Sequence, residues 1–211
     1  MPSTKDFVGI SLILISLGLI PTFPLMGLTG FFDNPLDQTK QVDVPFLAEV
    51  KADIVLVFVG YAGCGSVCPV SLATLRNVYV SYIQEHSGES LEIFFLGIPI
   101  PGQTVLEGEV DLYAKHFHED FRGYNLREVD RYQTLQKLGA NFTPLLFEPQ
   151  DLSHTSYIYL LQNVNGVWML KHTYTDYPPK AALILEDLQF LEERDISMSA
   201  NKRNIKLHLE N

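Results

Sequence analysis

The stretch IVLVFVGYAGCGSVCP covers residues 54–69 and decides which fold the chain is expected to adopt. Its first part, Ile54–Gly60, is almost entirely β-branched and aromatic, which is typical of a strand buried on both faces. Pro69 suits the first turn of a helix, where its missing N–H leaves no bond unmade. Apolar residues then recur at helical spacing up to about His86, namely Leu72, Leu75, Tyr79 and Tyr82. The stretch therefore predicts a buried strand that leads directly into a helix.

The rest of the chain predicts an α/β fold with a mixed sheet. The expected elements are strands at 91–98, 156–161 and 167–172 and helices at about 105–118, 128–138 and 179–194. Asn165-Gly166, between the last two strands, is a strong hairpin signal. The last helix is expected to place four apolar residues on one face, Ala182, Leu185, Leu188 and Leu191. An early strand–helix–strand unit implies parallel strands and the hairpin adds antiparallel ones, so we predict a thioredoxin-like mixed sheet flanked by helices.

The N-terminus carries an uncharged apolar segment, residues 7–28. About 20 such residues cross a bilayer as a helix, so the segment predicts a transmembrane helix. Lys5 precedes it, while Asp33 and Asp37 follow it before the next lysine, a weak bias that favours the N-terminus in the cytoplasm. A cleaved signal peptide is the alternative, although no small-x-small cleavage pattern follows the apolar run. The body of the protein is expected outside the cytoplasm, in a periplasm-type compartment or, in an organelle, an intermembrane space.

These patterns divide the chain into an N-terminal membrane anchor at 1–30, a tether at 31–50, a thioredoxin-like domain at 51–195 and a polar C-terminal tail at 196–211. A domain of this length can bury a core without a disulfide framework. The formal net charge is −10 and the isoelectric point is about 4.9. Phosphate binding depends on clustered Lys and Arg, so this acidic balance argues against nucleic acid as a partner.

Cys64 and Cys68 are the only cysteines, and three residues separate them at the predicted strand-to-helix junction. The N-terminus of a helix favours the thiolate form, which is both the nucleophile and the metal ligand. Two sulfurs at this spacing are able to chelate a soft metal, cycle between dithiol and disulfide, or form a static disulfide. Thioredoxin-type redox sites typically have two intervening residues, so the third favours a metal such as Cu(I), with zinc as an alternative.

A metal held by two sulfurs needs at least one further ligand, and six histidines are available. His116 and His118 lie two apart on a predicted helix and cannot face one point. Three more lie at a helix end, a strand end and in the tail, namely His86, His172 and His208. His154 precedes a predicted strand, where a lone histidine is more often structural than a ligand. The residues alone therefore leave the third ligand open.

Two segments, GYAGCGSVCPVSLATL at 60–75 and SHTSYIYLLQNVNG at 153–166, occur in this order along the chain. The first resembles the C-x-x-x-C-P motif of the SCO/SenC family, which also follows a buried strand. The second is similar to that family's D-H-T-x-x-x-Y-L-I-D-x-x-G stretch. The similarity spans roughly Val50 to Arg194, and the paired motifs are more specific than a lone pair of cysteines.

The resemblance implies a thioredoxin fold with an N-terminal anchor, and it implies that Cys64, Cys68 and His154 bind copper as Cu(I) or Cu(II). It also implies a Cys64–Cys68 disulfide in the oxidised protein. The family is associated with copper delivery to cytochrome c oxidase, so the implied partner is an acceptor cuproprotein such as a subunit of that oxidase. The chain is then a metallochaperone rather than an enzyme.

The sequence departs from the family pattern in three places. The segment 98–101, Ile-Pro-Ile-Pro, stands where the family usually has Asp-Pro after the second strand. Ser153 replaces the aspartate that usually precedes the histidine, and Gly65 and Ser66 replace the Pro-Asp usual between the cysteines. The three ligands remain, but the groups that orient them differ.

Two alternative functions remain open at this point. In the first, the protein is a thiol–disulfide oxidoreductase of exported partners, in which Cys64 attacks a disulfide and Cys68 resolves the mixed intermediate. In the second, it is a membrane-tethered interaction domain with a structural disulfide.

Overall fold

The structure is a computed structural model that describes residues 40–86, 90–99, 106, 108–144 and 152–209. The chain divides into two compact units, 1–38 and 39–211, and only the second contains described residues. The expected membrane anchor at 1–30 lies outside the described residues. Within the described ranges, no helix combines the length and the apolar character that crossing a bilayer requires.

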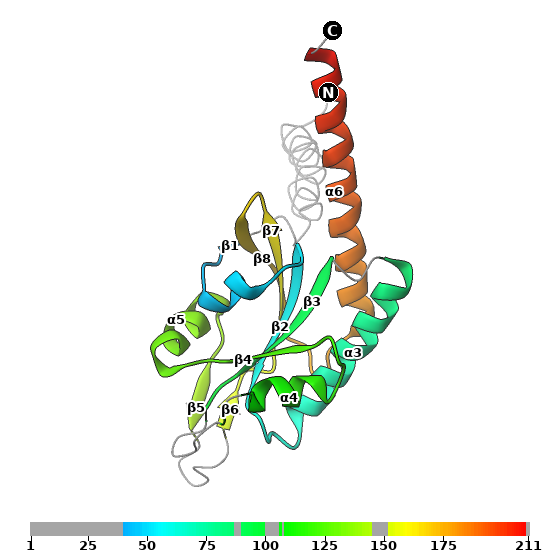
Figure 1. Cartoon of the computed structure of the whole chain (residues 1–211). Coiled ribbons are helices and arrows are strands. Elements are labelled where there is room, and N and C mark those ends of the chain that lie inside the picture. Colours follow the sequence, from blue (N-terminus) through cyan, green and yellow to red (C-terminus); the bar gives the residue numbers. More distant parts are fainter. Residues whose placement is uncertain (1–39, 87–89, 100–105, 107, 145–151, 210–211) are drawn as a thin grey trace, which may run out of the picture. The chain divides into compact units, whose positions relative to one another are not determined.

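A six-stranded sheet forms the centre of the second unit, in the order β1-β8-β7-β2-β3-β4 (Figure 1). Strands β2, β3 and β4 are parallel, whereas β2–β7, β7–β8 and β8–β1 pair antiparallel, which confirms the mixed sheet. The elements in chain order are β1 (Lys40–Gln41), η3 (Pro45–Glu49), β2 (Ile54–Gly60), α3 (Val67–Glu85), β3 (Leu91–Gly97), α4 (Glu109–Lys115), β4 (Arg122–Asn125), α5 (Glu128–Leu138), β5 (Phe142–Pro144), β6 (Leu152–His154), β7 (Ile158–Val164), β8 (Val167–Tyr174) and α6 (Ala181–Leu209).

The two faces of strand β2 bury different sets of side chains, because successive residues of a strand point to opposite faces. Val55, Val57 and Val59 belong to one core cluster, which also contains residues from η3 and α5. Helices α3 and α6 pack against each other, and α3 also contacts β2 and β3 (Figure 1). All seven residues of β2 are buried, as its apolar sequence predicts.

The predicted tether at 31–50 is too long, because residues 40–50 belong to the folded unit. Strand β1 pairs with β8, where Lys40 lies opposite Leu170. Val42, Val44 and Phe46 alternate with more exposed residues and are at most 4% exposed. Val42 and Val44 are two residues apart in extended chain and so share one side, while Phe46 is buried from η3. The described fold therefore begins at residue 40 and not at 51.

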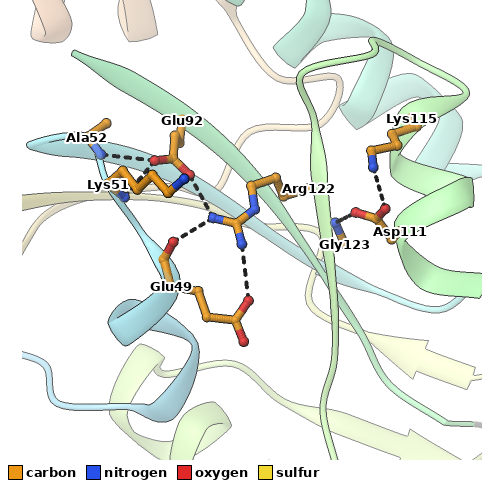
Figure 2. A network of polar contacts seen from close by, with 8 residues as sticks. All are labelled: Glu49, Lys51, Ala52, Glu92, Asp111, Lys115, Arg122 and Gly123. Carbon is orange, nitrogen blue, oxygen red and sulfur yellow. Dashed lines mark hydrogen bonds and ion pairs between the residues drawn. The ribbon is translucent and has the colours of Figure 1, made fainter. Parts of the chain in front are cut away.

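A polar network also attaches residues 49–52, which precede β2, to the sheet (Figure 2). The Glu92 carboxylate of β3 accepts the backbone N–H groups of Lys51 and Ala52 at 2.6 and 2.9 Å. The Arg122 guanidinium of β4 donates to Glu92 at 3.1 Å and to the side chain of Glu49 at 3.2 Å. Arg122 also lies over the ring of Phe94, 4.7 Å from its centroid. These contacts fix the chain where it enters β2.

The helices differ from the expectations at their ends. Helix α3 begins at Val67, so its first turn contains Pro69, as predicted, and also Cys68. Helix α4 is shorter than the 105–118 expected. The backbone of α6 stays helical to Leu209, beyond the residue 195 at which the domain was expected to end. Among the α6 side chains that the structure describes, Ile184, Leu188 and Leu191 are buried, whereas Ala182 is exposed, so the expected apolar face was partly wrong.

Candidate metal and thiol site

A tight turn between β2 and α3 positions the first cysteine. The Cys64 N–H donates to the Tyr61 carbonyl at 3.2 Å, which closes a four-residue turn. Gly63, the third residue of the turn, has a φ of +94°. Type II turns require such a positive φ at that position, and glycine adopts it without strain. The sequence Tyr-Ala-Gly-Cys therefore bends the chain back as soon as the strand ends.

Cys64 lies shortly before the N-terminus of α3, and its sulfur contacts the first turn of the helix. The Cys68 N–H donates to the Cys64 sulfur at 3.4 Å, while Ser66, the residue before the helix, makes no side-chain bond of this kind. The first N–H groups of a helix lack partners within the helix and carry partial positive charge. The Cys64 sulfur accepts one of them, an arrangement that stabilises negative charge on that sulfur.

Cys68 lies deeper than Cys64, with 0% of its surface exposed against 5% for Cys64. Its sulfur packs against Gly60, where an added Cβ would lie only 2.6 Å from the Cys68 Sγ. A side-chain hydrogen bond with Cys64, together with burial, raises the pKa of the Cys68 thiol. Both cysteines are thiols and no disulfide joins them. The predicted disulfide belongs to the oxidised protein and stays a prediction.

Tyr113 of α4 is a neighbour of the cysteines that the sequence did not reveal. Its hydroxyl donates to the Cys64 carbonyl at 3.2 Å. Burial, followed by the charges of Cys68 and Cys64, raises the pKa of the Tyr113 phenol, so the hydroxyl stays protonated at neutral pH. The two residues are 49 positions apart, and the helical pattern of 105–118 did not indicate which residue meets the loop.

The third predicted ligand, His154, lies on β6, whose backbone pairs with β5 opposite Phe142. Only the backbone of His154 is described, so its ring is not placed relative to the sulfurs. Its backbone can be located only through β7, which begins four residues later. Strand β7 starts at Ile158 opposite Phe58, two residues before the end of β2. The four residues from His154 to Ile158 span at most about 14 Å, which limits how far the His154 backbone lies from the start of β7.

Other histidines are engaged in carboxylate pairs. His86 Nε2 lies 2.6 Å from Glu192, and His172 Nδ1 lies 2.7 Å from Asp187. Tyr82 donates to Glu192 and Tyr174 to Asp187, so each of these two carboxylates of α6 contacts a tyrosine and a histidine. No group of three or more His, Cys, Asp or Glu side chains suited to a metal occurs among the described residues. The described side chains supply two sulfur donors, which fit a soft metal that takes a further ligand from elsewhere.

The departure from the family pattern at Ile98, after the second predicted strand, changes the residue buried beside the cysteine loop. Ile98 follows β3 where the family has an acidic residue, and its N–H donates to the Gly60 carbonyl at 2.7 Å. The side chain of Ile98 is only 3% exposed and belongs to the core cluster of β2. An apolar group is therefore buried next to the strand end from which the cysteine loop starts.

The geometry defines a class, a thioredoxin-like protein with two adjacent thiols at the junction between a central strand and a helix. The model of one family, SCO1/SenC, matches residues 40–188, which covers most of the chain and starts at β1. The chain therefore belongs to the SCO1/SenC family.

Relatives agree with this assignment. A SCO2-like protein of Rickettsia felis is 27% identical over 199 residues, covering 88% of this chain and 90% of that protein. The solution structure of apo Sco1 from Thermus thermophilus has a TM-score of 0.55 at 22% identity, covering 72% of this chain and 90% of its own. The crystal structure of Arabidopsis thaliana ScoI with copper bound has a TM-score of 0.54 at 18% identity, covering 67% and 84%. At these identities the two structures support the thioredoxin-like fold.

Proposed function

We propose that this chain is a copper metallochaperone that holds copper as cargo with Cys64, Cys68 and His154. One observation carries the proposal: two buried thiols lie four residues apart at the start of α3, and the Cys64 sulfur accepts the N–H of Cys68. Thiolates select Cu(I) over harder ions, and a helix N-terminus favours the thiolate. Copper bound to a similar Sco protein supports the same cargo here.

The third ligand in this proposal is the His154 imidazole. The support for it is topological, since β7 runs antiparallel to β2 and starts beside the strand end that leads into the cysteine loop. The residues that precede β7 therefore lie toward the end of β2 that leads into the cysteine loop. Two thiolates and one imidazole leave copper three-coordinate and open, so that the ligands of an acceptor can take it by exchange.

The proposed acceptor is a cuproprotein such as a subunit of cytochrome c oxidase, as the family resemblance implies. We further propose that the N-terminal segment at 1–30 anchors the protein in a membrane and that the folded unit lies outside the cytoplasm. Thiols in such a compartment are exposed to oxidation. Oxidation to a Cys64–Cys68 disulfide removes both thiolate ligands, so it releases the cargo and couples delivery to redox state.

The test is an anaerobic Cu(I) titration of the detergent-solubilised full chain against a chromophoric chelator. We expect one Cu(I) per chain, with sulfur and nitrogen coordination in X-ray absorption. Changing an outer partner of a metal ligand weakens binding about 10- to 100-fold, so Cys64→Ser and Cys68→Ser are expected to weaken it by more than about 100-fold. His154→Ala removes the nitrogen signal, whereas His116→Ala, at an exposed position, leaves binding unchanged. Copper binding that persists in both the Cys64→Ser and the His154→Ala variant would refute this site.

A second candidate is a thiol–disulfide oxidoreductase, because Cys64 lies nearer the surface and Cys68 lies behind it. Cys64 would attack the disulfide of a partner, and Cys68 would then displace the reduced partner. Reduction of a disulfide substrate by the metal-free protein, independent of His154 and without Cu(I) affinity in the wild type, would favour this function over copper delivery.

A further inference from the structure

We infer that Tyr113 is a positioning residue of the thiol site, whose hydroxyl holds the cysteine loop in its reduced, ligand-ready conformation. The inference deepens the proposed function and rests on it for its relevance to copper. The contact that carries it is the hydrogen bond from the Tyr113 hydroxyl to the Cys64 carbonyl, 3.2 Å long.

The loop between the cysteines has conformational freedom that such a bond would reduce. Gly65 and Ser66 are exposed, and a Cβ added at Gly65 would meet no atom within 4 Å. Glycine gives the unfolded and the folded loop wide conformational freedom. The backbone N–H bonds of Cys64 and Cys68 described above are local, within four residues. The Tyr113 bond instead comes from another helix and reaches the peptide group that joins Cys64 to Gly65.

The ring of Tyr113 is held in place by other aromatic rings. Its centroid lies 5.2 Å from that of Phe95 on β3 and 5.6 Å from that of Phe117. Phe95 also lies against Gly60, beside the Cys68 sulfur. The hydroxyl therefore projects from a packed aromatic cluster, and this packing restricts where it can bind.

Helix α4 is itself docked closely on the sheet. A Cβ at Gly123 would lie 2.2 Å from the Val110 carbonyl oxygen, and one at Gly97 would lie 2.5 Å from a Val110 methyl group, so both glycines allow a close approach. The Asp111 carboxylate accepts the Gly123 N–H at 3.0 Å and pairs with Lys115 at 2.6 Å (Figure 2). Burial opposes ionisation of Asp111, but these two partners outweigh it and lower the pKa of its carboxyl. The charged side chain thus fixes α4, and α4 fixes Tyr113.

The bond is present with both cysteines as thiols, and we assign it to the dithiol and not to the disulfide, so its loss disfavours the dithiol. The relevant equilibrium converts the two protein thiols and one glutathione disulfide into the protein disulfide and two glutathione thiols. Two electrons and two protons pass from the protein to glutathione, and the glutathione S–S bond breaks as the Cys64–Cys68 bond forms. A hydrogen bond of ordinary strength corresponds to a shift of roughly three- to tenfold in this equilibrium constant.

The decisive experiment measures that constant for the metal-free full chain in glutathione buffers of set ratio. We expect Tyr113→Phe, which keeps the ring, to shift it roughly three- to tenfold toward the disulfide. Tyr79→Phe is the matched control, because Tyr79 also donates one bond, to Asp120 at 3.1 Å, in a contact that does not include the cysteine loop. The control is expected to stay within twofold of wild type.

A Tyr113→Phe constant within twofold of wild type, or an equal shift in both variants, would overturn the inference. This readout needs no copper. Failure of the wild type to bind Cu(I) would therefore refute the proposed function while the glutathione equilibrium still decides the role of Tyr113.

Discussion

The two parts of the proposed copper site lie in regions of the fold that are built differently. The cysteines follow a central strand of a six-stranded sheet, and β2 pairs along its whole length with β3 and over residues 54–58 with β7. His154 lies on β6, in a separate two-stranded sheet with only three paired positions. The cysteine region is thus supported by a buried core, whereas the histidine region depends on a short ladder.

This difference indicates how copper would act on the protein. The sulfurs are already adjacent in the reduced structure, so copper requires little change there. A ligand from β6 joins the small sheet to the central one when it binds the same ion. Binding to a folded arrangement stabilises that arrangement by mass action. We therefore expect copper to stabilise the β5–β6 region more than the cysteine loop.

The largest effect is expected where the cysteine region is most tightly packed. In Gly60→Ala the new Cβ would lie 2.6 Å from the Cys68 sulfur and 2.9 Å from the Phe95 ring. Inserting atoms into a packed core typically costs 1–3 kcal/mol, so the free energy of unfolding should fall by about 3 kcal/mol. Urea unfolding measures this free energy. Gly65→Ala, where nothing lies within 4 Å, is the control and should change stability by less than about 0.5 kcal/mol. Equal values for the two variants would mean that the sulfur is not confined.

The complementary change weakens the histidine region alone. Phe142 of β5 lies opposite His154, and its half-buried ring packs against the core cluster. We expect Phe142→Ala to lower the free energy of unfolding by about 2 kcal/mol, less than the 3–5 kcal/mol of a fully buried phenylalanine. Cu(I) affinity should fall, while the glutathione equilibrium of the metal-free cysteines stays as in wild type. A shift in that equilibrium would show that the two regions are not independent.

The cysteine region could be predicted from the sequence because its signals are local. A continuous apolar run and a helical repeat gave β2 and α3, and the cysteines lie between them. Strand β4 was missed since its sequence, RGYN, has no apolar run, and its Gly123 is selected by contact with Val110 of α4. The hydrogen bond from Tyr113 to the Cys64 carbonyl could not be predicted from the sequence either, because only the packing of α4 determines which residue reaches the cysteine loop.

The histidine region was predicted by resemblance rather than by pattern. Strands β5 and β6 each have three residues, too few for an alternation to be recognised. The segment at 40–49 was read as a tether because Pro45 and nearby polar residues mask the buried alternation of Val42, Val44 and Phe46. For the 40–49 segment a partner distant in the sequence, β8, and not local preference, determines the structure.

A smaller effect is expected at the turn that presents Cys64. Gly63 has a φ of +94°, and a Cβ there meets no atom within 4 Å, so only backbone strain opposes Gly63→Ala. The left-handed region costs a non-glycine residue about 1 kcal/mol, and we expect a loss of that size in urea unfolding. Alternatively, the cysteine loop relieves this strain by changing its conformation, and such a change would shift the glutathione equilibrium of the two cysteines. No change in either measurement would contradict the role assigned to this turn.

The smallest effect at neutral pH concerns Tyr159, which lies on β7 where the histidine region joins the central sheet, opposite Val57. Burial raises the pKa of Tyr159 from 10 to about 12. Between these values the folded state holds a proton that the unfolded state has lost, so stability is intact below pH 10 and falls as the pH rises toward 12. In Tyr159→Phe this decline should be shallower by up to about 1.4 kcal/mol per pH unit. Urea unfolding at pH 9, 10 and 11 measures it, and parallel declines in the two proteins would show that the Tyr159 hydroxyl does not couple this junction to the stability of the sheet.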